Sequence, residues 1–364
     1  MVQRVYLFGF SRWKHKFIRV FLKEYDPKNV IFINPIISSP LHLAKKKKMD
    51  ASSHIFIWGK KEFQEIEKFA EENKIKITRV EDGFIRSIGL GSDLTQPYSL
   101  VVDKEGIYFD PTHPSELENI LNSYDFQKDE PLLKKAKALI ETIKESKISK
   151  YNADENRLLR FKTDKRVVLV PGQVEDDASI RFGAKGMTNR ELLSLVREAN
   201  PDAYIVFKPH PDVLSGNRVG DVQRSEALKY CDEIVTDIGM ASVLEAVDEV
   251  HTMTSLTGFE ALLYGKKVTT YGMPFYAGWG LTADRLKCER RVAALTLNEL
   301  AAGTLLLYPR YIHPVSKEFC EVDVLIEELK KEKEKLKGSF LYRLKFKTSN
   351  YISRTVQKIF SLVA

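Results

Sequence analysis

The chain has 364 residues, of which 43% are hydrophobic, and a net charge of +7, so it is long enough for two domains and apolar enough for two cores. No run of about 18 apolar residues is present, and Arg, Trp, Lys and His interrupt the amino-terminal stretch, so we expect neither a membrane-spanning helix nor export by a signal peptide. Three widely spaced cysteines without a CxxC pair exclude a disulfide framework and a thiolate zinc site, so a cytoplasmic protein is expected.

The positive charge is partly local, with one cluster at 45–48 and another in the tail from Lys330 onward. Such a balance suits an anionic substrate, an anionic lipid or nucleic acid. Because no nucleic-acid-binding motif is present, we expect no nucleic-acid partner.

In the first half, short apolar runs alternate with longer stretches of helical periodicity, which is typical of a parallel α/β architecture. Strands are predicted at 4–10, 29–35, 54–59 and 76–81, and helices at 11–25, 60–74, 115–123 and 130–152. Residues 98–111 indicate a hairpin turning at Lys104-Glu105-Gly106, or two edge strands.

The second half restarts this rhythm. Strands are predicted at 166–172, 203–210, 233–237, 249–255 and 266–272, with helices between them such as 188–200. With no Gly-x-Gly-x-x-Gly fingerprint, the pattern predicts a GT-B-like α/β protein of two Rossmann-like domains facing a cleft, with ligands at the carboxyl ends of the strands. The predicted divisions are 1–155, 156–315 and a helical, basic, amphipathic tail at 316–364.

Three groups of polar residues follow predicted strands. Glu81 and Asp82 enter a glycine-punctuated loop with Arg86, where a carboxyl group can be tuned for acid/base work. The alternative is a cap and tight turn, in which Asp82 accepts backbone N–H bonds. Lys208 and His210 end another strand before Pro211 and suit a phosphate, although a lone histidine is usually structural.

The third group is the run Glu175, Asp176 and Asp177, with Ser179 and Arg181 close by. Adjacent carboxylates repel one another and raise one another's pKa, so cations or hydrogen bonds are needed to offset the cost. Solvated surface acids are the alternative interpretation.

A fourth segment has the character of an anion site. Ser255 and Thr257 precede Gly258 and open a helix, where hydroxyls and backbone N–H groups meet, and Glu260 on the first turn is a candidate ribose partner. These features predict a nucleotide-sugar donor, and because no DxD motif is present we expect no metal or other cofactor. Substrate contacts are expected from Arg86, Gln173, Ser179, Arg181, Tyr276 and Trp279.

Read together, six segments in order resemble the β-Kdo transferases of bacterial capsule assembly, of the KpsC type. They are "VEDGFIRSIGLGSD", "PYSLVVDKEGIYFDPTHPSELENIL", "SKYN", "PGQVEDDASI", "KPHPDVLSGNR" and "TSLTGFEALLYGKKVTTYGMPFYAGWGLT". The resemblance implies a GT-B fold, a CMP-β-Kdo donor and retention of configuration. It also implies that Asp177 is the nucleophile, that Glu81 or Asp82 is the acid/base, and that Lys208 and His210 stabilise the CMP phosphate.

Such proteins join two transferase modules, and this single module looks more like the second, which hints at a β-(2→7) linkage. The resemblance implies a lipid-linked Kdo oligosaccharide acceptor and other capsule assembly proteins as partners. The basic amphipathic segment from Lys331 predicts peripheral contact with an anionic membrane, or a final helix packing on the first domain. Two other functions stay open: a sialyltransferase that uses CMP-sialic acid, and a non-catalytic, membrane-associated module of the capsule machinery.

Overall fold

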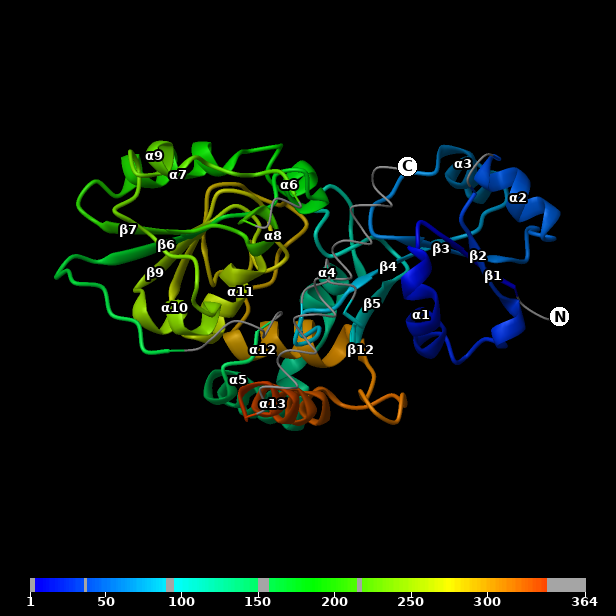
Figure 1. Cartoon of the computed structure of the whole chain (residues 1–364). Helices are drawn as coiled ribbons and strands as arrows, with labels where there is room; N and C mark the ends of the chain where they lie inside the picture. The colour runs from blue at the N-terminus through cyan, green and yellow to red at the C-terminus, as the bar shows by residue number, and fades with distance from the viewer. Residues whose placement is uncertain (1–3, 36–37, 90–94, 150–156, 215–217, 339–364) are drawn as a thin grey trace. The chain divides into compact units, whose positions relative to one another are not determined.

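The computed structural model describes residues 4–35, 38–89, 95–149, 157–214 and 218–338. By their contacts the residues form two compact units: Met1–Ile107 with Tyr308–Ala364, called here the first unit, and Tyr108–Leu307, the second unit. In the described ranges each unit holds a six-stranded sheet with helices packed on it (Figure 1). The predicted α/β architecture with two mainly parallel sheets is therefore confirmed.

The first unit has the strand order β12-β5-β4-β3-β1-β2. The strands are β1 (Val5–Phe8), β2 (Val30–Ile33), β3 (His54–Trp58), β4 (Ile77–Asp82), β5 (Ser99–Asp103) and β12 (Pro309–Tyr311). The helices are α1 (His15–Phe21), α2 (Pro40–Lys46), α3 (Gln64–Glu72) and α13 (Val322–Gly338), with 3₁₀ turns η1 (Arg12–Lys14) and η2 (Pro27–Asn29). Strands β1 to β4 run parallel, so their carboxyl ends share one edge.

Alternation along β1 shows why this sheet separates two cores. Val5 and Leu7 pack with Ile18 of α1, whereas Tyr6 and Phe8 point to the other face and pack with Ile66 of α3. Successive side chains of a strand point to opposite faces, so a strand covered on both sides is apolar throughout. Each such side chain contributes about 1.5–3 kcal/mol to folding through burial.

The predicted hairpin at 98–111 is wrong. Only its first half forms a strand, β5, which pairs antiparallel with β4 on one side and with β12 on the other. Residues 104–106 instead form a turn that Asp103 closes, because its Oδ1 accepts the N–H groups of Glu105 and Gly106 at 2.9 and 2.8 Å. The partner of β5 comes from residues 309–311, about which local sequence carries no signal.

The second unit has a fully parallel sheet in the order β11-β10-β9-β6-β7-β8. The strands are β6 (Val167–Pro171), β7 (Tyr204–Lys208), β8 (Glu233–Ile234), β9 (Glu249–Thr252), β10 (Lys267–Thr270) and β11 (Ala283–Asp284). Helices α7 (Asn189–Ala199) and α9 (Arg224–Ala227) lie on one face, and α10 (Met240–Ala246) and α11 (Leu256–Leu263) lie on the other (Figure 1). The remaining elements are α4 (Glu116–Ser123), η4 (Phe126–Lys128), α5 (Glu130–Ser146), α6 (Ala178–Gly183), α8 (Pro211–Leu214), α12 (Leu297–Ala301) and the π-helical turn η5 (Ala302–Leu307).

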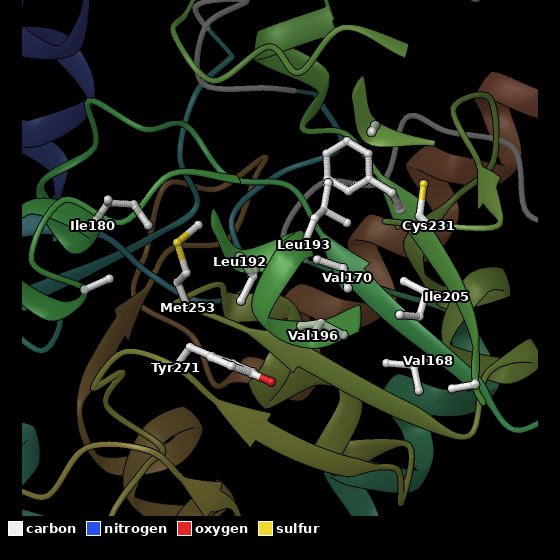
Figure 2. Close-up of a cluster of buried hydrophobic side chains, with 14 residues drawn as sticks. Val168, Val170, Ile180, Leu192, Leu193, Val196, Ile205, Cys231, Met253 and Tyr271 are labelled. Carbon is white, nitrogen blue, oxygen red and sulfur yellow. The ribbon is translucent and has the colours of Figure 1, made fainter. Parts of the chain in front are cut away.

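Figure 2 shows how α7 covers this sheet, with Leu192 and Val196 directed at Val168, Val170 and Ile205. Thr188 caps the helix in a capping box with Glu191, as the sequence "TNRE" favours. The same cluster contains Ile180 of α6, so this core extends beneath the loop that follows β6. That loop carries the predicted acid cluster.

The structure divides the chain differently from the predicted boundary at 155/156. Residues 108–149, expected in the first domain, group with the second unit, and residues 308–315, expected in the second, group with the first. The reason is tertiary: Glu118 of α4 is buried and accepts bonds from Arg290 Nε at 2.6 Å and Arg291 Nε at 3.1 Å. Arg291 in turn donates to the carbonyl of Ala277 at 2.7 Å, which ties α4 to the 274–280 loop.

Glu118→Gln is expected to destabilise the second unit by about 3–5 kcal/mol, because it leaves buried Arg291 without a compensating charge. The measurement is the urea concentration at which half of the protein is unfolded, with the dependence of the unfolding free energy on urea unchanged. Glu289→Gln is the matched control, since Glu289 pairs with Lys287 on the surface and such pairs contribute about 0–1 kcal/mol. Equal midpoints for the two variants would contradict the structural role of Glu118.

The tail predicted to be helical begins as expected with α13, which ends at Gly338. Residues 339–364, on which the predicted membrane contact depends, lie outside the described residues. No helix in the described ranges has the length and apolar character needed to cross a bilayer.

Candidate functional site

In the first unit, the carboxyl edge of the sheet carries the Glu81-Asp82-Gly83 segment. Strand β4 ends at Asp82, and Gly83 is required next because a Cβ there would collide with the side chain of Ser99. Both carboxylates therefore lie at the strand end, where ligands bind in such sheets. Glu81 is partly exposed and its Oε1 accepts the N–H of Asp82 at 2.9 Å.

Arg86 is fully buried and holds this segment from within. Its Nε donates to Asp82 Oδ2 at 2.8 Å, its Nη1 to Ser87 Oγ at 2.8 Å and its Nη2 to the carbonyl of Thr95 at 2.9 Å. All three nitrogens thus have donor roles inside the unit. The expectation that Arg86 contacts substrate is corrected: its side chain positions Asp82.

Two lysines that sequence reasoning missed lie near these carboxylates. Lys14 Nζ sits 3.2 Å from the centroid of the Trp58 ring and 4.0 Å from Asp82 Oδ1. Burial lowers the pKa of Lys14, while Asp82 and Glu81 oppose that shift. Burial also lowers the pKa of Lys61, opposed by Glu81, and Lys61 Nζ donates to the carbonyl of Gly9 at 2.6 Å.

These lysines give Glu81 neighbours that ionise less readily than ordinary lysines. A carboxylate in such partly buried surroundings can have its protonation tuned for proton transfer. Their positions in the sequence could have revealed these two lysines. Lys14 comes shortly after β1 and Lys61 shortly after β3, and the carboxyl ends of both strands share an edge with β4.

In the second unit, the acid cluster follows β6, and its three members have separate partners. Glu175 Oε1 accepts the N–H of Asn189 at 2.7 Å, and exposed Asp176 accepts Arg218 Nη2 at 3.0 Å. Asp177 is the N-cap of α6 and accepts the Ser179 N–H at 2.9 Å. The mutual repulsion expected from sequence is thereby offset, with hydrogen bonds or an ion pair for each carboxylate.

The two oxygens of Asp177 differ. Oδ1 accepts both the N–H and the hydroxyl of Ser179, at 2.9 and 2.7 Å. Within the ranges that the structure describes, Oδ2 accepts no hydrogen bond, and the residue is partly exposed. One oxygen is therefore held by Ser179, while the other accepts no hydrogen bond from the described residues, an arrangement compatible with a nucleophilic carboxylate.

A series of side-chain hydrogen bonds leads to Asp177. Gln173 Nε2 donates to Thr254 Oγ1 at 3.0 Å, Thr254 Oγ1 donates to Ser179 Oγ at 3.3 Å, and Ser179 Oγ donates to Asp177 Oδ1. Gln173 is buried, and its Oε1 accepts the N–H of Thr254 at 2.9 Å. The predicted residues Gln173, Ser179 and Asp177 thus come together through Thr254, which sequence reasoning missed although it follows β9.

The carboxyl end of β7 lies beside the acid loop. Gly172 donates its N–H to the carbonyl of Lys208 at 2.8 Å, and a Cβ at Gly172 would lie 3.2 Å from the backbone N of His210. Lys208 is buried, and its Nζ donates to the Thr236 carbonyl at 3.2 Å. His210 Nδ1 accepts the N–H of Asp212 at 3.1 Å, so in the neutral ring the proton is on Nε2, which is a donor suited to phosphate.

The segment at 254–258 forms the expected helix N-terminus. Ser255 caps α11 by accepting the N–H of Thr257 at 3.2 Å. Gly258 is needed because a Cβ there would overlap the Tyr276 hydroxyl, which donates to the Ser255 carbonyl at 2.5 Å. Glu260 lies in the second turn of α11, one turn later than predicted.

Two of the predicted substrate contacts, both aromatic, lie inside the second unit. Tyr276 and Trp279 are buried, Trp279 Nε1 donates to the Phe275 carbonyl at 2.7 Å, and burial raises the pKa of Tyr276 well above its usual range. Both rings pack inside the unit, so the expected substrate role is corrected to a structural one. Arg181 is exposed on α6, with its guanidinium 5.0 Å from the Phe182 ring centroid.

Across the described ranges, no group of three or more His, Cys, Asp and Glu side chains is arranged to hold a metal ion. The polar groups at the two carboxyl edges are carboxylates, hydroxyls, a histidine and lysines. Chemically, the edge of the first unit can supply a proton carrier, and the edge of the second unit can supply a nucleophile and donors to an anionic leaving group.

A family model described as "Capsule polysaccharide biosynthesis protein" matches residues 53–311. The capsule polysaccharide modification protein LipA of Neisseria meningitidis serogroup A is 45% identical over 336 residues, which are 92% of this chain and 46% of LipA. The lipopolysaccharide-processing protein LpsZ of Rhizobium meliloti is 37% identical over 332 residues, 90% of this chain and 74% of LpsZ. The chain thus spans about half the length of LipA.

Two solved structures of Thermosulfurimonas dismutans KpsC are also similar. One, a "beta Kdo 2,7 transferase", has 38% identity and a TM-score of 0.70, with 91% of this chain and 99% of that chain covered. The other, a "beta Kdo 2,4 transferase", has 35% identity and a TM-score of 0.76, with 91% and 98% covered. Identity is higher with the first and the TM-score with the second, so the match does not separate the two linkages.

Proposed function

Since the chain belongs to the capsule polysaccharide biosynthesis protein family, we propose that it is a retaining β-Kdo glycosyltransferase. It would transfer Kdo from CMP-β-Kdo to a β-Kdo-terminated glycolipid linker, through a β-(2→7) bond. The resemblance to KpsC-type transferases stated from the sequence is confirmed by the two KpsC matches, which cover nearly all of those chains. Two α/β units with parallel sheets support a GT-B assignment.

The observation that carries the proposal is the partly exposed carboxylate of Asp177, whose Oδ1 is held by the N–H and the hydroxyl of Ser179. In the first displacement, Oδ2 attacks the anomeric carbon of Kdo and the bond from that carbon to the CMP phosphate oxygen breaks. The products of this step are a glycosyl ester on Asp177 and free CMP. Because attack inverts the centre once, a second inversion is needed for retention.

In the second displacement, the acceptor hydroxyl attacks the anomeric carbon and the ester bond to Asp177 breaks. Glu81 of the first unit takes the hydroxyl proton, and Asp177 returns as a carboxylate. Glu81 is preferred over Asp82 because Asp82 Oδ2 is committed to the buried Arg86.

Departure of CMP leaves negative charge on its phosphate. His210 Nε2–H, the Lys208 side chain and the α11 N-terminus with Ser255 and Thr257 are proposed to stabilise that charge without a metal ion. Glu260 is proposed as a ribose contact, although its place in the second turn makes it the weakest member of this set.

The test is incubation of the chain with CMP-Kdo and a lipid-free acceptor that ends in a single β-Kdo. We expect CMP release and a product extended by one Kdo, whose linkage and anomeric configuration NMR reads together. CMP-sialic acid is the competing donor, and faster transfer from it would overturn the donor assignment. Absence of CMP release with any Kdo-bearing acceptor would instead indicate a non-catalytic module.

A further inference from the structure

The first unit contains a cavity of about 510 Å³ that the proposed reaction does not use. It opens at the amino edge of the sheet, beside His54, the first residue of β3, and Thr78 near the start of β4. We call it the amino-edge pocket; all the residues that line it belong to the first unit.

The pocket is separate from the Glu81 carboxylate. Strand β3 runs from His54 at the pocket to Trp58 at the opposite edge, and Trp58 pairs with Val80, the residue before Glu81. At about 3.3 Å per residue, the two edges are about 13 Å apart along the strand. A sugar at Glu81 therefore cannot also occupy the pocket.

The pocket wall is predominantly cationic. Its charged members are Lys74, Lys76, Lys104, Arg310 and a single acid, Glu24. Arg310 Nη1 contacts Glu24 Oε1 at 2.8 Å, and Lys76 Nζ contacts Glu105 Oε1 at 2.6 Å. Such solvent-exposed pairs contribute only about 0–1 kcal/mol, so an incoming anion can exchange for them. Lys74 and Lys104 are exposed at the same opening.

The remaining wall is suited to a polar, ring-shaped ligand. Tyr25 and His54 meet at 2.9 Å between the hydroxyl and Nδ1, with their rings nearly perpendicular at 81°. Burial and the nearby Lys104 lower the pKa of His54, which favours the uncharged imidazole. Ser52, Ser53 and Thr78 add hydroxyls, as in ligand pockets where a few polar groups fix orientation.

We propose that the amino-edge pocket binds a carboxylated sugar of the acceptor chain, one that lies away from the reacting end. The inference rests on the proposed function, which supplies an acceptor carrying one carboxylate per residue. Several spaced cations match spaced carboxylates, and the hydroxyl and aromatic groups match the sugar ring. A bilayer is a poorer match, because Phe56 and Val102 of the pocket are buried and offer no apolar surface to insert.

The experiment measures binding of a lipid-free β-linked Kdo trisaccharide to the full chain by calorimetry at neutral pH and low salt. Lys74→Glu/Lys104→Glu reverses two exposed charges of the pocket, and Lys46→Glu/Lys137→Glu makes the same charge change at exposed sites outside it. We expect the pocket variant to raise the Kd at least about tenfold, equivalent to about 1.4 kcal/mol, and the control to stay within about twofold of wild type.

The binding measurement needs no turnover, so it separates failure of the pocket from failure of the proposed function. With an active enzyme, the pocket variant should raise KM more for a trisaccharide acceptor than for a single Kdo. Equal trisaccharide affinity in wild type and the pocket variant, or no binding by wild type, overturns the inference. The inference would also be overturned if the pocket variant lost binding to vesicles containing phosphatidylglycerol but bound the trisaccharide as wild type does. That result would assign the pocket to a lipid headgroup.

Discussion

Asp177→Asn is expected to lower Kdo transfer by at least about 10³-fold while the protein keeps its stability, because loss of a nucleophile removes the main route of reaction. An amide has little nucleophilic power, yet its oxygen can still accept the N–H of Ser179 that caps α6. Asparagine and aspartate cap helices about equally well, so the free energy of unfolding should change by less than about 0.5 kcal/mol. Initial rates of CMP release measure the loss of transfer, and a thermal melt measures the change in stability.

Asp176→Asn is the matched control for this substitution, since it makes the same chemical change one residue away. Asp176 is exposed and pairs with Arg218 at the surface, so its loss should leave the rate within about threefold. Mass spectrometry of intact wild type with CMP-Kdo should find one added Kdo, and analysis of the digested protein should place it on a peptide containing Asp177. If Asp177→Asn and Asp176→Asn transferred Kdo equally fast, Asp177 would not be the nucleophile.

Glu81→Gln and Asp82→Asn are expected to fail in different ways, although the two residues are adjacent. Glu81→Gln should lower kcat by about 10²–10⁴ with little change in stability, because only a proton carrier is lost. Asp82→Asn should destabilise the first unit by about 3–5 kcal/mol, because the fully buried Arg86 loses its counter-charge. Urea unfolding and kcat at saturating substrate measure these outcomes.

The double substitution Asp82→Asn/Arg86→Met tests the reason for the instability. Replacing a buried ion pair with neutral groups restores part of the stability that the removal of one partner takes away, so the double variant should unfold at higher urea than Asp82→Asn alone. An active Glu81→Gln together with a stable, inactive Asp82→Asn would reverse the two roles.

Local pattern predicted the strands well, because each is a short apolar run that ends in polar residues. The runs at 4–10, 54–59 and 166–172 correspond to β1, β3 and β6. Strands buried on both faces need apolar residues throughout, and this demand is visible in a few consecutive letters. The rule that ligands meet the carboxyl ends of parallel strands then pointed to the segments around Glu81, the acid run at 175–177 and His210, and the family resemblance singled out Asp177 within that run.

Burial of individual side chains was not predictable in the same way. Arg86, Tyr276 and Trp279 belong to residue types that often contact ligands, yet their polar atoms bond to neighbours inside their own units. Lys14 and Lys61 escaped notice because their lowered pKa values arise from burial, which no short sequence pattern encodes.

The α/β class, the parallel sheets, the family and the set of carboxylates at strand ends could all be read from local sequence. Three features became visible only in the folded chain: β12 closes the first sheet against β5, Glu118 ties α4 to Arg290 and Arg291, and Asp82 pairs with Arg86. The division has a physical reason. Strand formation and strand ends depend on neighbouring residues, whereas pairing and burial depend on residues far apart in the chain that meet only after folding.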